Sequence, residues 1–157
     1  MNEREKLASN SARCTIRQPR PADFKRMAEL AGQLGYPCTD TQVRERIEEM
    51  RNSPEHAVFV AALTGDRVAG WVGCFVFRAV ELDKCAEISG LIVDEEMRSQ
   101  GVGAALLEAA EQWARSIGCG AISVHTNITR ERAHGFYMGN GYRWVKTQEF
   151  LRKTLSA

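Results

Sequence analysis

The sequence predicts a mixed α/β fold, in which helices pack in layers against a sheet that is only partly parallel. The main observation is the order of its patterns: a strand, two helices, three strands, then a helix, a strand, a helix and closing strands. The second is composition, because 157 residues with 44% apolar and 26% charged content suit one globular domain. We expect a single mixed sheet of about six or seven strands with about four helices on its two faces.

Helices are expected where apolar residues recur every three or four positions. Asp23 can cap the first, and Thr39 with Gln42 forms the pattern of a capping box for the second. The third is the most regular, and Glu111 and Arg115 can pair across one of its turns. The four helices are predicted at 24–34, 39–51, 102–117 and 130–138.

Strands are expected where Val, Ile, Phe and Trp concentrate between turn residues. Thr64-Gly65-Asp66-Arg67 separates two such stretches and predicts an antiparallel hairpin. The strands are predicted at 14–17, 57–63, 68–80, 85–93 and 121–126, with two more between 142 and 155.

Charge and cysteine content argue against several classes of protein. Twenty-one Lys and Arg against 20 Asp and Glu leave a net charge of +1, so no global field attracts nucleic acid or an anionic membrane. Residues 1–12 show no signal peptide and are expected to be a flexible extension before one domain at 13–157. Five widely spaced cysteines without a Cys-x-x-Cys pair favour a reducing cytoplasm and no metal site.

The stretch RSQGVGA, residues 98–104, joins a predicted strand to a predicted helix. Free N–H groups at a helix N-terminus attract phosphate, and glycines let the backbone approach it. A dinucleotide-binding fold would need a third glycine where Leu106 stands, and a P-loop would need Gly-Lys-Ser/Thr, which is absent. Another kind of phosphate loop is therefore indicated.

The pattern Arg/Gln-x-x-Gly-x-Gly/Ala resembles the acetyl-CoA loop of the GCN5-related N-acetyltransferase (GNAT) family. It follows a strand, residues 87–94, as it does in that family, and the family's Ala-x-x-Phe-Tyr-x-x-x-Gly-Tyr pattern follows at 133–142. The resemblance covers residues 68–142 and implies the GNAT fold. It also implies transfer of acetyl from acetyl-CoA to an amine, without a metal.

One position departs from the family pattern. Many members carry an asparagine three residues before the alanine, where this chain has Arg130, while Asn127 lies three residues earlier. Either Asn127 or Arg130 could contact the cofactor, and helix capping by Asn127 with a solvated Arg130 is an equal alternative.

The resemblance also implies which residues hold the donor. Backbone amides of the loop and the Arg98 side chain would hold the pyrophosphate, and the preceding strand would align the pantetheine as an added strand would. Gly90 would permit a bulge that aims an N–H at the thioester oxygen. The residues implied to bind the cofactor are Leu91, Ile92, Val93, Arg98, Ser99, Gln100, Gly101, Val102, Gly103, Ala104, Asn127, Arg130 and Tyr137.

Two residues are candidates for the chemistry. Glu87 is the leading general base, placed on the same side of its strand as Ser89, Leu91 and Val93, where partial burial makes a carboxylate more basic. An exposed Glu87 paired with a cation is an equal alternative, and His125 and His134 are weaker candidates. The family places the Tyr137 hydroxyl at the cofactor sulfur, where it would protonate the departing thiolate.

The acceptor is the least defined part of the prediction. In this fold the acceptor contacts come from the first two helices with their connection and from the last strands. We expect a small-molecule primary amine and direct attack in a ternary complex, with a homodimer possible. A peptide acceptor and a non-catalytic acyl-CoA sensor are the alternatives. The candidate contacts are 34–37, Trp144 and Phe150, with Asp40, Glu81 and Asp83 as carboxylates for a cationic amine.

Overall fold

A computed structural model describes residues 13–156. The extension expected at residues 1–12 lies outside the described residues. Contacts divide the chain into two compact units, one ending at Val124 and one beginning at His125. The single domain expected at 13–157 stays a prediction.

The first unit is built on one mixed sheet of five strands in the order β1-β2-β3-β4-β5. Neighbouring strands are antiparallel from β1 to β4, and β5 lies parallel to β4. The mixed α/β fold is confirmed, with five strands in place of six or seven. The strands are β1 (Thr15–Arg17), β2 (His56–Ala62), β3 (Val68–Phe77), β4 (Cys85–Val93) and β5 (Ile122–Val124).

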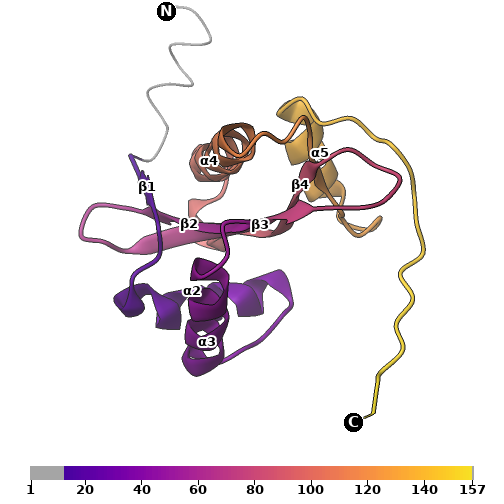
Figure 1. Ribbon diagram of the computed structural model, residues 1–157. Helices are drawn as coiled ribbons and strands as arrows, with labels where there is room; N and C mark the ends of the chain where they lie inside the picture. The colour runs from indigo at the N-terminus through magenta and orange to yellow at the C-terminus, as the bar shows by residue number, and fades with distance from the viewer. Residues whose placement is uncertain (1–12, 157) are drawn as a thin grey trace, which may run out of the picture. The chain divides into compact units, whose positions relative to one another are not determined.

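Helices cover both faces of this sheet. Figure 1 shows α2 (Phe24–Leu34) and α3 (Asp40–Arg51) on one face and α4 (Val102–Ser116) on the other. The core on the α2 side joins Leu30 and Ile47 to Val60 and Ile92, all nearly inaccessible to solvent. On the other face α4 buries Leu106 and Leu107. No helix within residues 13–156 is long and apolar enough to cross a bilayer.

Of the two predicted helix N-caps, the one at Thr39 is confirmed and the one at Asp23 makes no capping hydrogen bond. The Thr39 hydroxyl accepts from the Gln42 N–H at 3.1 Å and the Gln42 side chain accepts from the Thr39 N–H at 3.0 Å, which confirms the capping box. Asp23 stands at the N-cap of α2, but its carboxylate makes no hydrogen bond to that helix. It accepts instead from Arg17 and from the Arg20 N–H, both at 2.6 Å, because a charged guanidinium is a stronger donor than a neutral helix N–H.

A β-bulge interrupts the pairing of β3 with β4. Gly73 lies opposite Gly90 while Cys74 lies opposite Ile88, so Ser89 is the extra residue on β4. A Cβ on Gly73 would lie 2.8 Å from the Ser89 hydroxyl, so a side chain at this position would require Ser89 to shift. The bulge expected at Gly90 is therefore present.

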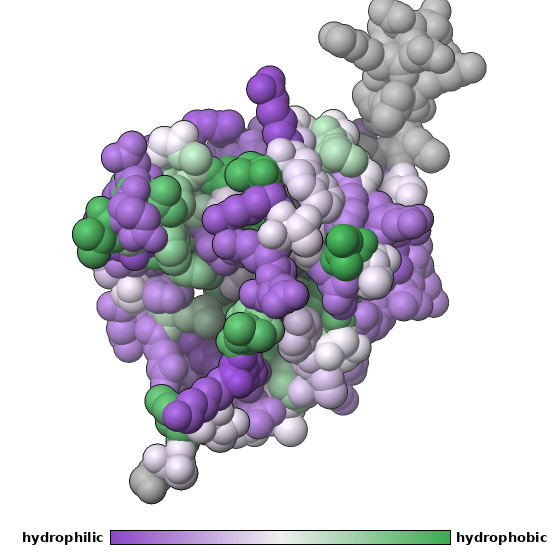
Figure 2. Space-filling view, turned by 90° about the vertical axis from the view of Figure 1, so that its right-hand side faces the viewer, coloured by the Kyte–Doolittle hydropathy of each residue, from purple (hydrophilic) through white to green (hydrophobic). Residues whose placement is uncertain are grey.

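The second unit contains α5 (Glu131–Gly139), with Arg130 at its N-cap. The prediction of two strands within 142–155 is wrong, since residues 143–156 form none. A strand requires a neighbouring strand to share its backbone hydrogen bonds, and strand propensity alone does not supply one. Figure 2 shows apolar residues dispersed among polar ones on one face. Five of the large exposed ones follow α5: Trp144, Val145, Phe150, Leu151 and Leu155.

Candidate active site

The loop between β4 and α4 has the backbone shape of an anion cradle. A short 3-10 helix, η2 (Glu95–Met97), leads into it. Ser99 and Gly101 have φ of 62° and 84°, and Gly101 is the N-cap of α4. Left-handed residues turn successive N–H groups toward one side, which is how backbone nests bind anions. Glycine at 101 adopts this conformation without strain.

The first turn of α4 offers free donors at this cradle. The first intrahelical bond runs from the Ala105 N–H to the Gly101 carbonyl at 3.1 Å. Among the described residues, the N–H groups of Val102, Gly103 and Ala104 therefore have no backbone acceptor. The partial positive charge of a helix N-terminus acts at the same place. These residues fit a pyrophosphate.

The side chains of Arg98 and Gln100 form hydrogen bonds with backbone carbonyls of the loop and of the end of β4. The Arg98 Nε donates to the Val93 carbonyl at 3.4 Å, and its guanidinium lies 3.9 Å from the Glu95 carboxylate. The Gln100 side chain donates to the Glu96 carbonyl at 3.2 Å. The Arg98 side chain remains 32% exposed, so its charge stays accessible beside the cradle.

Strand β4 presents an open edge next to the loop. Strand β5 pairs only with Ala86, Glu87 and Ile88, so among residues 13–156 no strand pairs with β4 on that side beyond the bulge. The Asp94 N–H donates to Ala69 on β3, and backbone direction alternates along a strand. Main-chain groups of Leu91 and Val93 therefore face the open edge, whereas those of Ile92 face β3.

The bulge also decides which face of the sheet carries Glu87. Glu87 lies opposite Phe75 and Ile92 opposite Trp71, on one face, whereas Leu91 lies opposite Val72 on the other. The prediction that Glu87 shares a side with Leu91 and Val93 is wrong, because the extra residue reverses the alternation. Glu87 is partly buried, on the face that α2 covers.

In the second unit, the helix end after α5 positions Tyr137. The Tyr142 N–H donates to the Tyr137 carbonyl at 3.0 Å and the Gly141 N–H to the Met138 carbonyl at 3.1 Å, the two bonds of a Schellman motif. Gly141 takes the required positive φ of 89°. The rings of Tyr137 and Tyr142 pack at 5.4 Å, and burial raises the pKa of Tyr137 to about 12.

The polar residues before α5 mainly hold a turn. The Asn127 Oδ1 accepts from both the N–H and the hydroxyl of Thr129, at 3.0 and 2.8 Å. The Asn127 carbonyl lies 3.0 Å from His134 Nε2, and the His134 ring meets the edge of Trp144. Arg130 and His125 are exposed. A cofactor contact by Asn127 or Arg130 stays a prediction.

The residues predicted for the acceptor are spread over exposed positions. Tyr36 is 71% exposed after α2, and Glu81 and Asp83 lie in the exposed turn between β3 and β4. Trp144 and Phe150 are also largely exposed in the second unit. Within residues 13–156 no group of three His, Cys, Asp or Glu side chains could hold a metal ion.

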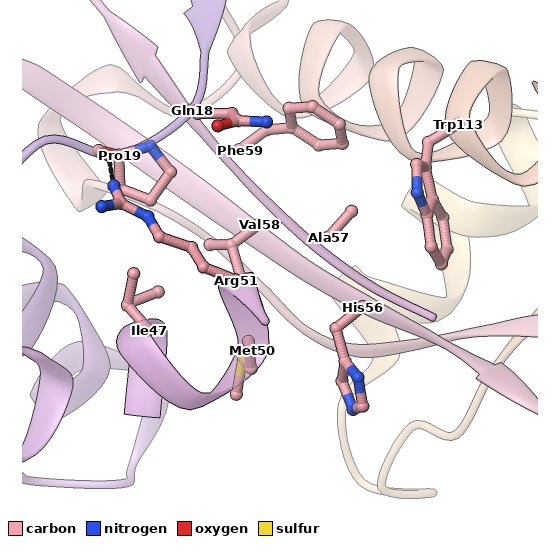
Figure 3. A pocket seen from close by; sticks show the side chains of 10 residues that line it. All are labelled: Gln18, Pro19, Ile47, Met50, Arg51, His56, Ala57, Val58, Phe59 and Trp113. Carbon is pink, nitrogen blue, oxygen red and sulfur yellow. Dashed lines mark hydrogen bonds between the residues drawn. The ribbon is translucent and has the colours of Figure 1, made fainter. Parts of the chain in front are cut away.

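A separate pocket of about 170 Å³ lies at the edge of β2 beyond the end of β1. Figure 3 shows its lining of both polar and apolar side chains, with Met50 and Arg51 of α3, His56 and Phe59 of β2, and Trp113 of α4. It contains no residue of the loop and none of the predicted site residues, so it is distinct from the cradle.

Sequence reasoning missed Asp94, which is only 3% exposed at the end of β4. The sequence did contain an indication of its role: Asp94 directly follows an apolar strand and precedes the loop, and a charged residue buried at such a position requires a partner.

Comparisons with known proteins agree with this geometry. Residues 24–142 match the acetyltransferase (GNAT) family. An aminoglycoside N(6')-acetyltransferase type 1 of Stenotrophomonas maltophilia is 27% identical over 146 residues, which cover 90% of this chain and 94% of that protein. An aminoalkylphosphonate N-acetyltransferase of Salmonella typhimurium is 36% identical over 83 residues, 52% of this chain and 54% of that protein.

A solved structure supports the fold. The aminoglycoside N-acetyltransferase AAC(6')-Iy, in complex with CoA, superposes with a TM-score of 0.80 at 20% identity, covering 91% of this chain and 96% of that one. The family match spans most of the chain and includes both the loop and the helix that carries Tyr137. The chain therefore belongs to the acetyltransferase (GNAT) family and is an acetyl-CoA-dependent N-acetyltransferase.

Proposed function

We propose that this enzyme transfers acetyl from acetyl-CoA to the primary amine of a small molecule. The observation that carries the proposal is the cradle at the N-terminus of α4 beside the open edge of β4. The relatives support the acceptor class, because two of them are named for small amines, an aminoglycoside and an aminoalkylphosphonate.

The first unit holds the pyrophosphate and the pantetheine of the donor. The N–H groups of Val102, Gly103 and Ala104, with the charge of Arg98, hold the pyrophosphate. Main-chain groups of Leu91 and Val93 pair with the pantetheine as a neighbouring strand would. When bound, acetyl-CoA supplies an acetyl group activated as a thioester.

The acceptor amine has to lose a proton before it can attack. An alkyl amine has a pKa near ~10.4, so the neutral form costs about 4.6 kcal/mol at pH 7. Glu87 is the proposed base: its carboxylate is partly buried on β4, two residues before the bulge. General-base assistance of this kind contributes about 10²- to 10⁴-fold.

The departing thiolate has to gain a proton. The Tyr137 hydroxyl is the proposed acid, and its pKa of about 12 keeps it protonated throughout the neutral range. The Schellman motif fixes the ring by packing Tyr142 against it. No enzyme nucleophile takes part, so the amine attacks directly in a ternary complex.

The experiment that tests this function measures release of free thiol from acetyl-CoA with a panel of acceptors. The panel holds aminoglycosides, aminoalkylphosphonates and lysine-containing peptides, and hydrolysis without acceptor is the baseline. Thiol release with a small amine above the baseline supports the proposal. Release with peptides alone would move the acceptor class to protein, and CoA binding without release across the panel would indicate a sensor.

The cellular setting follows from the cysteines. All five cysteines are free, and Cys74 is buried in the sheet, where burial raises its pKa to about 12 and makes the thiol unreactive. We propose that the enzyme works in the reducing cytoplasm.

A further inference from the structure

Two carboxylates are buried among the described residues, Asp23 and Asp94, and only Asp94 adjoins the donor loop. Its side chain meets two cations from distant parts of the chain. Arg26 of α2 donates to its Oδ2, and so does Arg67 of the β2–β3 turn, at 3.3 Å. The carboxylate thus ties a helix and a hairpin to the end of β4.

The other carboxylate oxygen and the backbone of Asp94 define the first turn of the loop. Its Oδ1 accepts from the Glu96 N–H at 3.3 Å, and its carbonyl accepts from the Met97 N–H at 2.8 Å. Its own N–H donates to Ala69 at 2.8 Å, which anchors the turn to β3. Every hydrogen-bonding group of Asp94 is therefore committed to the point where the loop begins.

Neighbouring side chains complete this anchorage. The Gln33 side chain of α2 accepts from the Glu95 N–H at 3.2 Å, and Arg67 also contacts the Glu96 carboxylate at 3.4 Å. Burial acts to raise the pKa of Asp94, but the Glu96 N–H, the charge of Arg26, Gln33 and the charge of Arg67 together hold it below its usual range. Asp94 is therefore a carboxylate at neutral pH.

The contacts of Arg98 and Gln100 lie within the loop and its flanks, whereas Asp94 ties the start of the loop to α2 and β3. Residues 95, 96, 99 and 101 are exposed, and Ser99 sits in a left-handed conformation that costs a non-glycine residue about 1–2 kcal/mol. A strained and solvated segment keeps one conformation only where its ends are fixed. We propose that Asp94 is a positioning residue of the donor site, whose buried carboxylate fixes residues 95–101 in the shape that receives the pyrophosphate. This inference rests on the proposed function of the loop.

An electrostatic role and a positioning role of Asp94 predict opposite changes in CoA binding when its carboxylate is lost. Removing a negative charge beside an anion site strengthens anion binding if electrostatics dominates. If the loop loses its anchor, CoA binding weakens, because residues 95–101 must then become ordered when CoA binds and this costs conformational entropy. The proposal requires weaker binding.

The test compares wild type, Asp94→Ala, the near-isosteric Asp94→Asn, and the control Asp23→Asn. Asp23 is matched because it too is buried and paired with an arginine, Arg17, but it lies in the turn before α2. Calorimetry with CoA should show a Kd raised about tenfold by Asp94→Ala, the loss of about one charge-assisted hydrogen bond, and raised less by Asp94→Asn. The Kd of Asp23→Asn should equal that of wild type.

Two further readouts separate positioning from general destabilisation. Asp94→Ala should raise the KM for acetyl-CoA more than the KM for acetyl-pantetheine, which lacks the pyrophosphate, whereas Asp23→Asn should leave the ratio of the two KM values as in wild type. Amide hydrogen exchange of the free protein should be faster at Glu96 and Met97 in Asp94→Ala than in Asp23→Asn.

The results that would overturn the proposal differ from those that would overturn the function. CoA binding by Asp94→Asn that is unchanged or tighter would overturn the positioning role and leave the proposed function intact. An effect of Asp94→Ala that is equally large with acetyl-pantetheine and with acetyl-CoA would do the same. Wild type that does not bind CoA overturns the proposed function and this inference with it. If Asp94→Ala does not fold, the binding and exchange of Asp94→Asn decide.

Discussion

Gly70 of β3 lies opposite Val93 at the end of β4, and a single methyl group there tests the packing beside the proposed donor site. A Cβ on Gly70 would lie 2.5 Å from the Ile92 carbonyl oxygen and 3.3 Å from the Val93 Cα. Both are backbone atoms of β4, so neither can rotate away as a side chain could. We expect Gly70→Ala to force β4 outward just where Leu91 and Val93 face the open edge.

The magnitude follows from the cost of overpacking. Adding a methyl group to a well-packed core lowers the free energy of unfolding by about 1–3 kcal/mol, and the contact with backbone atoms places Gly70→Ala at about 3 kcal/mol. In a chain of this size that lowers Tm by roughly 6–12 °C, and the same displacement should raise the Kd for CoA. Differential scanning fluorimetry and calorimetry measure the two effects.

Gly120→Ala is the matched control. A Cβ at Gly120 meets nothing within 4 Å. Removing its backbone freedom should leave stability unchanged or raise it by about 0.4–1 kcal/mol. A Gly70→Ala protein as stable as Gly120→Ala, with unaltered CoA binding, would refute the close packing of β3 on β4.

Three more predictions concern the proposed chemistry and the buried ion pairs. Tyr137→Phe should lower kcat by about 10²- to 10⁴-fold at saturating acetyl-CoA if it is the acid, and unchanged turnover would remove that role. Glu87→Gln should lower kcat/KM at pH 7 and recover as the pH approaches the pKa of the amine, whereas a loss independent of pH would exclude a base. Burial acts to raise the pKa of Asp23, but Arg17 and the Arg20 N–H outweigh it and hold the pKa below its usual range. The stability from this pair is therefore fully present above about pH 4 and is lost as the pH falls through the folded pKa. The free energy of unfolding in urea should therefore decrease less on acidification for Asp23→Asn than for wild type. An equal decrease in both proteins would contradict the pairing.

The parts of the fold predicted correctly are those that local chemistry decides. The capping box of Thr39 and Gln42 and the helix from residue 102 follow from the residues within one or two turns. The strands before residue 94 were also placed within a few residues, because their apolar runs end at turn residues. The stretch after Tyr142 failed for the opposite reason: its apolar residues resemble a strand, but pairing depends on a neighbour that lies elsewhere in the chain.

The site divides in the same way. The RSQGVGA loop and the Phe136-Tyr137 pair were recognisable because the family pattern places particular residue types at fixed spacing. Asp94 was not recognisable as an anchor, because its partners Arg26 and Arg67 lie 68 and 27 residues away and only the folded chain brings them together.

The sequence by itself therefore determined the family and the order of elements as far as α5, since each is encoded by neighbouring residues. Only the tertiary structure decided which face carries Glu87, because one extra residue at the bulge reverses the alternation of side chains along β4. It also decided how the loop is held, since a buried carboxylate is stable only where distant cations converge on it.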